Sequence, residues 1–138
     1  MFKNKKLLAT IVVGGLLVAG LIIAYLFRPE KECVCNEKSQ VELSASDLIS
    51  QYETDENQSN GAFLGKVITV SGTVNSVKND EKGNAIVELD GGSIGMVSCT
   101  LCKKESAKVE LAAGSNVRIK GECVGYTIDV VLVKCCIE

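Results

Sequence analysis

A run of 21 apolar, uncharged residues, Leu7–Phe27, constrains this chain more than any other feature. As an α-helix the run would be about 31 Å long, which matches the hydrocarbon thickness of a bilayer. A buried core helix of this length would normally have a polar face, and this run has none. We therefore expect residues 7–27 to form a transmembrane helix that attaches the rest of the chain to a membrane.

The end of the run favours a retained signal anchor over a cleaved signal peptide. A cleaved signal has a shorter apolar core followed by small residues at the cleavage site, whereas this run ends Ala24-Tyr-Leu-Phe27. A lipoprotein signal would place a cysteine directly after the apolar core, but Cys33 lies six residues beyond Phe27, behind several charged residues.

Flanking charge predicts the orientation of the anchor. Lys3, Lys5 and Lys6 precede the run, and the residues that follow it carry mixed charge. Positively charged flanks stay on the cytoplasmic side of a membrane. We therefore expect residues 1–6 in the cytoplasm, a stalk over residues 28–42, and a domain over residues 43–138 outside the cytoplasm, in the cell envelope.

Alternating β-branched residues predict a mainly β domain. A helix is expected over about residues 45–53, with a broken continuation through Phe63. Strands are expected over residues 67–77, 85–89, 94–101, 116–124 and 128–136, with a short helical link over residues 103–111. A small sheet must protect its edges, and a closed five-stranded barrel does so. The helical link between the third and fourth strands is typical of an OB-fold.

Several motifs resemble a known family. They are Gly65-Lys-Val67, Val70-Ser-Gly-Thr-Val74, Val97-Ser-Cys-Thr100 and Gly121-Glu-Cys-Val-Gly-Tyr126. Together they make residues 43–137 resemble the bacterial tRNA_anti-like OB-fold family, whose members are mostly small exported or membrane-attached proteins. The family name records a fold relation to tRNA anticodon-binding domains. The resemblance therefore implies an OB-fold barrel and does not by itself imply RNA binding.

Cysteines are the residues that stand out for chemistry. The chain has seven: Cys33, Cys35, Cys99, Cys102, Cys123, Cys135 and Cys136. An odd number leaves at least one thiol free or paired between chains. Structural disulfides, buried free thiols and a zinc or redox site all remain open.

A zinc site would need four converging thiolates, and Cys99, Cys102, Cys135 and Cys136 could supply them. Adjacent residues of a strand point to opposite faces, which opposes convergence of the last two. The Cys99-x-x-Cys102 pair begins within a predicted strand, whereas redox pairs of this spacing normally begin a helix. We therefore predict no metal site, no cofactor and no cofactor-binding residue.

The OB topology suggests a disulfide pairing, because its third and fifth strands are parallel neighbours. We expect Cys99 or Cys102 to bond to Cys135 or Cys136. Cys33, Cys35 and Cys123 are then the expected free or interchain thiols.

Catalysis and nucleic-acid binding are both disfavoured. The chain contains no histidine, no glycine-rich phosphate loop and no recognisable nucleophile motif, so we predict no enzyme and no catalytic residue. Residues 85–101, which would form the binding platform of an OB-fold, contain no aromatic or basic residue. Residues 28–138 hold 12 Lys and Arg against 17 Asp and Glu, a net charge of −5.

The favoured hypothesis is a non-catalytic binding or assembly module with a single membrane span. Its partner would be a protein or small ligand at the envelope. The alternative is a thiol-based redox or metal-binding envelope protein, and nucleic-acid binding is the less favoured third hypothesis.

Overall fold

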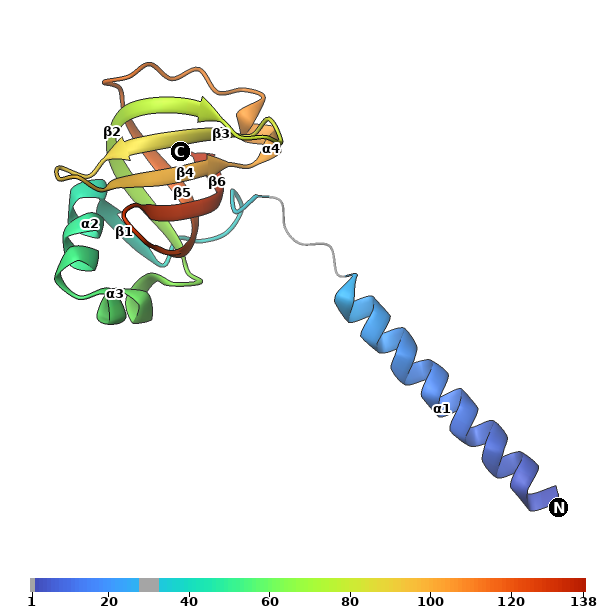
Figure 1. Ribbon diagram of the computed structural model, residues 1–138. Coiled ribbons are helices and arrows are strands. Elements are labelled where there is room, and N and C mark those ends of the chain that lie inside the picture. The colour runs from blue at the N-terminus through green and yellow to red at the C-terminus, as the bar shows by residue number, and fades with distance from the viewer. Residues whose placement is uncertain (1, 28–32) are drawn as a thin grey trace. The chain divides into compact units, whose positions relative to one another are not determined.

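The computed structural model describes residues 2–27 and 33–138, and the chain divides into two compact units at about residue 30 (Figure 1). The first unit contains helix α1, Phe2–Leu26, of which Asn4–Leu26 is long and apolar enough to cross a membrane. The predicted span is thus helical up to Leu26. Residues 28–32 of the predicted stalk lie outside the described residues.

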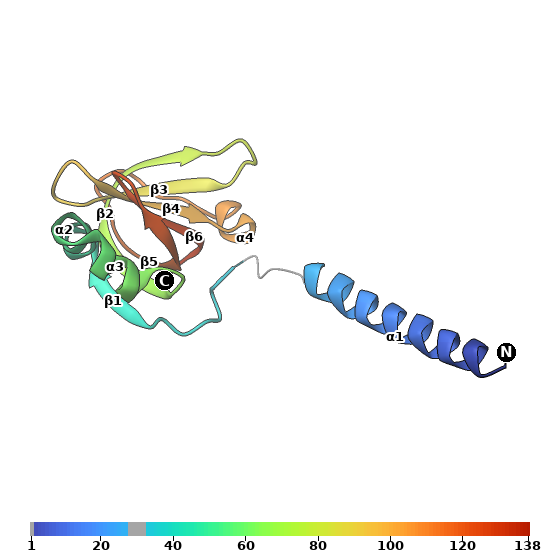
Figure 2. The ribbon, with the colours of Figure 1, turned by 60° about the horizontal axis from the view of Figure 1, so that its bottom comes forward.

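The second unit is a closed β barrel, as the sequence predicts. Its strands are β2 (Val67–Asn79), β3 (Ala85–Asp90), β4 (Met96–Leu101), β5 (Asn116–Tyr126) and β6 (Val130–Ile137). Strands β2, β3 and β4 form an antiparallel meander, β6 lies parallel to β4, and β5 closes the barrel by pairing with both β6 and β2. This is the OB-fold order, and it can be followed in Figure 2.

Apolar side chains fill the barrel because every second residue of each strand points inward. Along β3, for example, Ala85, Val87 and Leu89 are buried while the residues between them are half-exposed. Helix α4 (Lys103–Ser106) is the predicted link after β4, although it is shorter than expected.

Two helices, α2 (Ala45–Thr54) and α3 (Glu56–Phe63), pack against one end of the barrel (Figure 1). The predicted break is at Asp55, which ends α2 and begins α3, where its carboxylate accepts a hydrogen bond from the backbone N–H of Gln58 at 3.0 Å. Helix α2 buries the predicted stripe of Leu48, Ile49 and Tyr52.

One strand has no counterpart in the sequence prediction. Strand β1, Val41–Ser44, lies parallel to the first half of β2. Residues 33–42, which the sequence assigns to a stalk, pack against the barrel in the structure. Val34 is 2% exposed, and its backbone N–H donates to the carbonyl of Lys134 at 3.1 Å. The backbone N–H of Gln40 donates to the carbonyl of Val67 at 2.8 Å.

Candidate cysteine site

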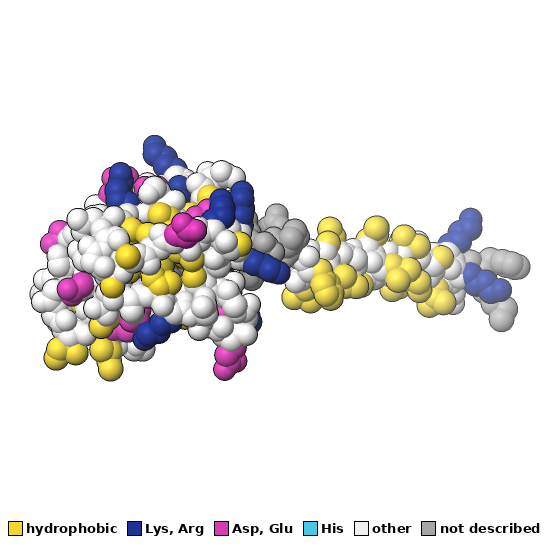
Figure 3. Space-filling view, turned by 90° about the horizontal axis from the view of Figure 1, so that it is seen from above, with side chains coloured by type: hydrophobic (Ala, Val, Ile, Leu, Met, Phe, Trp, Pro, Cys, Tyr) yellow, Lys and Arg dark blue, Asp and Glu magenta, His cyan; other side chains and the backbone are white. Residues whose placement is uncertain are grey.

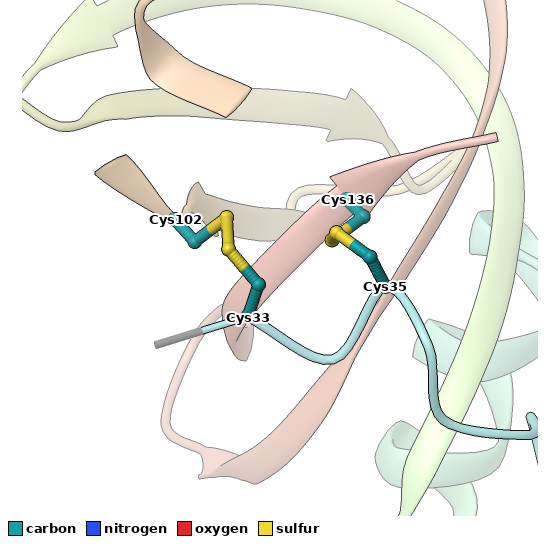
Figure 4. Close-up of side chains that lie close together, drawn as sticks. All are labelled: Cys33, Cys35, Cys102 and Cys136. Atoms are coloured by element: carbon teal, nitrogen blue, oxygen red, sulfur yellow. A yellow bond between two sulfur atoms is a disulfide. The ribbon is translucent and has the colours of Figure 1, made fainter. Parts of the chain in front are cut away.

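All seven cysteines lie in the described part of the chain, and they form two groups. Cys33 is disulfide-bonded to Cys102, and Cys35 to Cys136 (Figure 4). The other three, Cys99, Cys123 and Cys135, are buried free thiols. The two disulfides join the segment before β1 to the end of β4 and to β6.

The structure pairs the cysteines differently from the sequence expectation. The expected bond between Cys99 or Cys102 and Cys135 or Cys136 is not formed. Cys102 and Cys136 bond instead to Cys33 and Cys35, which the sequence left as free or interchain thiols. Strands β4 and β6 are indeed parallel neighbours, with Leu101 opposite Cys135. The prediction that these two strands are neighbours is therefore confirmed. The expected pairing was wrong because residues 33–42 were treated as a stalk away from the barrel.

A bulge in β6 explains why neighbouring strands do not give the expected bonds. The pairing of β6 shifts register near Lys134 on both of its edges, against β4 and against β5. Lys134 has a φ of 57°, in the left-handed region that side chains seldom adopt. Such a bulge re-aims the residues that follow it. Cys135 then joins the core, while Cys136 bonds to Cys35 on the outer side of the strand.

The same bulge receives the segment that carries Cys33 and Cys35. The carbonyl of Lys134 accepts the hydrogen bond from Val34 described above, which places Val34 between the two disulfides. Val34 is buried, and the cysteines on either side of it bond to Cys102 and Cys136. The Nζ of Lys120 donates to the carbonyl of Cys35 at 2.9 Å and fixes the segment from β5.

The free thiols lie in an environment that suppresses their reactivity. Burial raises the pKa of the Cys135 thiol well above its ordinary value, and a hydrogen bond with Cys99 raises it further. Cys123 lies 3.5 Å from the hydroxyl of Tyr52, whose pKa is raised by burial and by this contact. A thiol that stays protonated is a poor nucleophile, which applies to Cys135. All three cysteines are buried in the core, where a reagent dissolved in water does not reach them.

The sequence pattern of the tRNA_anti-like family matches residues 1–137. The chain belongs to the tRNA_anti-like family. No curated protein matches it.

The first solved structure named here shares the fold of this tRNA_anti-like protein. A candidate nucleic acid-binding lipoprotein from Klebsiella pneumoniae subsp. pneumoniae MGH 78578 is 18% identical, with a TM-score of 0.59, and the match covers 80% of this chain and 99% of that one. A candidate aspartyl-tRNA synthetase from Leishmania major Friedlin is 16% identical, with a TM-score of 0.49, over 72% of this chain and 21% of that one. The asparaginyl-tRNA synthetase of Entamoeba histolytica is 21% identical, with a TM-score of 0.40, over 56% of this chain and 22% of the synthetase.

The outer face of β3 and β4 in this tRNA_anti-like protein carries hydroxyl and apolar side chains and the carboxylate of Glu88. Ile86, Glu88, Ser98 and Thr100 lie half-exposed on it. The carboxylate of Glu88 accepts hydrogen bonds from Ser76 Oγ at 2.8 Å and from Lys78 Nζ at 3.0 Å, and these bonds lower its pKa. Neither strand contributes an aromatic or basic side chain on which bases could stack or phosphates bind.

A shallow groove crosses β2 between β1 and β5, but its cation is already paired. One cavity along it, of about 490 Å³, is lined by Ser71, Gly72, Glu138 and residues 116–118. Arg118 forms ion pairs with Glu42 at 3.3 Å and with Glu138 at 3.6 Å. The two carboxylates offset the charge of the guanidinium, so an anion in the groove would compete with both of them for Arg118.

Proposed function

We propose that this tRNA_anti-like protein is a non-catalytic binding module that is anchored outside the cytoplasm by α1 and docks to a protein of the envelope through one end of its barrel. The observation that carries the proposal is a pair of exposed isoleucines on adjacent loops. Ile94 is 89% exposed in the loop between β3 and β4, and Ile128 is 69% exposed in the loop between β5 and β6.

The two loops form one surface. The backbone N–H of Met96 donates to the carboxylate of Asp129 at 3.0 Å. Gly95 lies so close to the carbonyl of Ile128 that a Cβ at position 95 would come within 2.7 Å of the oxygen. Hydrophobic side chains project from one end of the domain in Figure 3. Burying two isoleucine side chains against a partner would contribute roughly 1.5–3 kcal/mol each before the costs of association.

Location outside the cytoplasm is supported by the disulfides. Structural disulfides form and persist in oxidising compartments and are rare in the cytosol. Lys5 and Lys6 at the beginning of α1 favour a cytoplasmic N-terminus. The lysines precede the anchor and the disulfides lie in the domain that follows it. Both support a cytoplasmic N-terminus with the domain outside the cytoplasm.

The state of the cysteines supports a role without chemistry. The chain has no histidine, four of its cysteines are oxidised, and the other three are buried. No described cysteine is therefore an accessible thiol nucleophile in this state. This argues against the thiol-redox alternative for the oxidised protein.

The test is site-specific photo-crosslinking of the full-length protein in intact cells. A photoreactive amino acid is placed at Ile94 or Ile128, with Val77, a β2 residue that is 37% exposed, as the matched control position. We expect one protein, identified by mass spectrometry, to be crosslinked from positions 94 and 128 and not from position 77. The I94D/I128D variant should no longer copurify with that protein.

Absence of a specific product at positions 94 and 128, or equal products at position 77, would contradict the docking surface. Orientation is tested separately with a reporter fused after Glu138 that is active only outside the cytoplasm. An active reporter is expected. A silent one, with an active cytoplasmic reporter at the same position, would contradict the proposed location.

A further inference from the structure

The four oxidised cysteines form one compact cluster of sulfur atoms. The Sγ atoms of Cys33, Cys35, Cys102 and Cys136 all lie within 4.8 Å of one another. Figure 4 shows the two disulfides side by side between the N-terminal segment, the end of β4 and β6. Two independent structural disulfides would not need to be this close. The convergence calls for an explanation beyond cross-linking.

The spacing is close to that of a metal tetrathiolate. In a tetrahedral zinc site each Zn–S bond is about 2.3 Å, which places the sulfur atoms about 3.8 Å apart. Opening the two S–S bonds would let bonded sulfurs separate, while the unbonded sulfurs are already within range. The required shifts are of the size that side-chain rotation can supply.

The positions of the four cysteines in the fold also suit a metal site in which all ligands come from the protein. Cys33 and Cys35 come from one short segment, and Val34 between them is buried and fixes its orientation. Cys102 and Cys136 come from the barrel and are only 5% and 3% exposed. Cys33 and Cys35 are half-exposed, so the cluster lies at the surface of the barrel. A site with four protein sulfurs is the structural type of zinc site, without an open position for substrate.

A cation lies beside the cluster. Lys120 is the cross-strand partner of Cys136, its side chain is 11% exposed, and its Nζ donates to the carbonyl of Cys35. Zinc with four thiolates has a net charge of −2, which a nearby ammonium stabilises. Glu138 lies 3.6 Å from the same Nζ and offsets part of this effect.

We propose that the reduced protein binds one zinc ion through Cys33, Cys35, Cys102 and Cys136, so that the cluster has two alternative states, a pair of disulfides and a zinc tetrathiolate. The four cysteines considered in the sequence analysis included Cys99 and Cys135, which lie in the core. In the site proposed here Cys33 and Cys35 take their places. The inference does not depend on the proposed docking function.

The two states interconvert by a balanced exchange with an external dithiol. Each S–S bond takes two electrons and two protons from one dithiol, which becomes a disulfide, so two dithiols convert the cluster to four thiols. Binding of Zn²⁺ then forms four Zn–S bonds and releases four protons. In the reverse direction two disulfide oxidants take up the four electrons together with four protons and become dithiols, the two S–S bonds form again, and the zinc ion leaves.

The test uses the full-length protein in detergent, reduced with excess dithiol that is then removed under argon. Co²⁺ is titrated into the protein as a spectroscopic probe, followed by Zn²⁺. We expect one equivalent of Co²⁺ to give the intense visible and charge-transfer bands of a tetrahedral tetrathiolate, and Zn²⁺ to abolish them. The oxidised protein should give no bands.

Two variants locate the site. C33S/C35S should lose the tetrathiolate bands, whereas C99A, which removes a member of the other quartet, should retain them. Circular dichroism of each sample reports folding with and without metal. Zinc-dependent folding of the reduced protein would support the site, since metal binding then supplies folding free energy. The proposal is overturned if the reduced wild type gives no bands, folded or unfolded, or if C33S/C35S gives the same bands as the wild type.

Discussion

Gly121 in β5 lies directly against the thiol of Cys135 in β6, so close that a Cβ atom at position 121 would overlap the Sγ atom. The same Cβ would be 3.1 Å from the Cβ of Leu132 and 3.2 Å from the carbonyl oxygen of Val133. Gly121 therefore provides space for the bulge of β6 and for the inward thiol. Gly121 is the first residue of the motif Gly121-Glu-Cys-Val-Gly125. This motif therefore accommodates the bulge of β6 that positions Cys135 and Cys136.

The first prediction concerns this contact. G121A should lower the free energy of unfolding by about 1–3 kcal/mol, because an added methyl overpacks the core. In a C135A background the same substitution should cost less, since the space left by the sulfur accepts the methyl. Urea unfolding of the full-length protein in detergent measures this coupling.

G61A is the matched control for that experiment, because a Cβ at this helical position meets nothing within 4 Å. It should leave stability unchanged or raise it by up to about 1 kcal/mol. Strictly additive effects of G121A and C135A would contradict the contact.

The second prediction concerns the disulfides. The bonded cysteines are 69 and 101 residues apart, so each bond restricts the unfolded chain strongly. Removing either pair, by C33S/C102S or by C35S/C136S, should lower the free energy of unfolding by about 3–4 kcal/mol. The measurement is made with a chelator present, so that no metal replaces the bond.

Peptide mapping without reductant should recover the linked pairs Cys33–Cys102 and Cys35–Cys136, with Cys99, Cys123 and Cys135 alkylated only after unfolding. Recovery of Cys99–Cys135 or Cys102–Cys136 instead would contradict the position that the structure gives residues 33–35 on β6. The C99A variant, which removes no disulfide, is the control for loss of a buried sulfur.

Local patterns were enough to predict the barrel. Alternation of β-branched residues predicted all five of its strands, and the loosely helical spacing of Leu48, Ile49, Tyr52 and Phe63 predicted a helix with a broken continuation. The resemblance in Gly121–Tyr126 agreed with these patterns. The strands and helices were therefore predictable, because each of them depends on residues that are close together in the sequence.

The cysteine site depends on features that leave little local signal. The bulge is at Lys134, where no glycine marks the left-handed conformation, and β1 is four residues long among polar neighbours. Without them, residues 33–42 read as a polar stalk. The available clue was Val34, a lone apolar residue between two cysteines that would face the same side of an extended segment.

The third prediction concerns acid stability. Hydrogen bonds from Ser76 and Lys78 lower the pKa of Glu88 below its ordinary value of 4.5. A lowered carboxyl pKa contributes stability that is fully present above the ordinary value and is lost as the pH falls through the folded-state value. E88Q should therefore be less stable than the wild type at pH 7, by on the order of 1 kcal/mol, because Lys78 is exposed and screened.

The difference between E88Q and the wild type should shrink as the pH falls below 4.5, which urea unfolding at a series of pH values measures. E53Q is the control, since it changes a carboxyl on α2 that accepts a hydrogen bond from Ser93 at 2.7 Å. A stability difference that stays constant from pH 7 to strongly acidic pH would contradict the role of the ionised Glu88.

The last prediction is that the protein binds neither single-stranded RNA nor single-stranded DNA appreciably at physiological salt. The OB platform on β3 and β4 has no aromatic or basic side chain, its central carboxylate is Glu88, and the cation Arg118 is held by two carboxylates. Single-strand binders of this fold combine stacking side chains with a positively charged groove. Strands β3 and β4 contribute neither. Fluorescence anisotropy with labelled oligonucleotides and the full-length protein in detergent tests this, with a single-strand-binding OB-fold protein as the positive control. Saturable binding tighter than about 10⁻⁶ M, the tight end of non-specific binding, would show that another face of the barrel recognises nucleic acid.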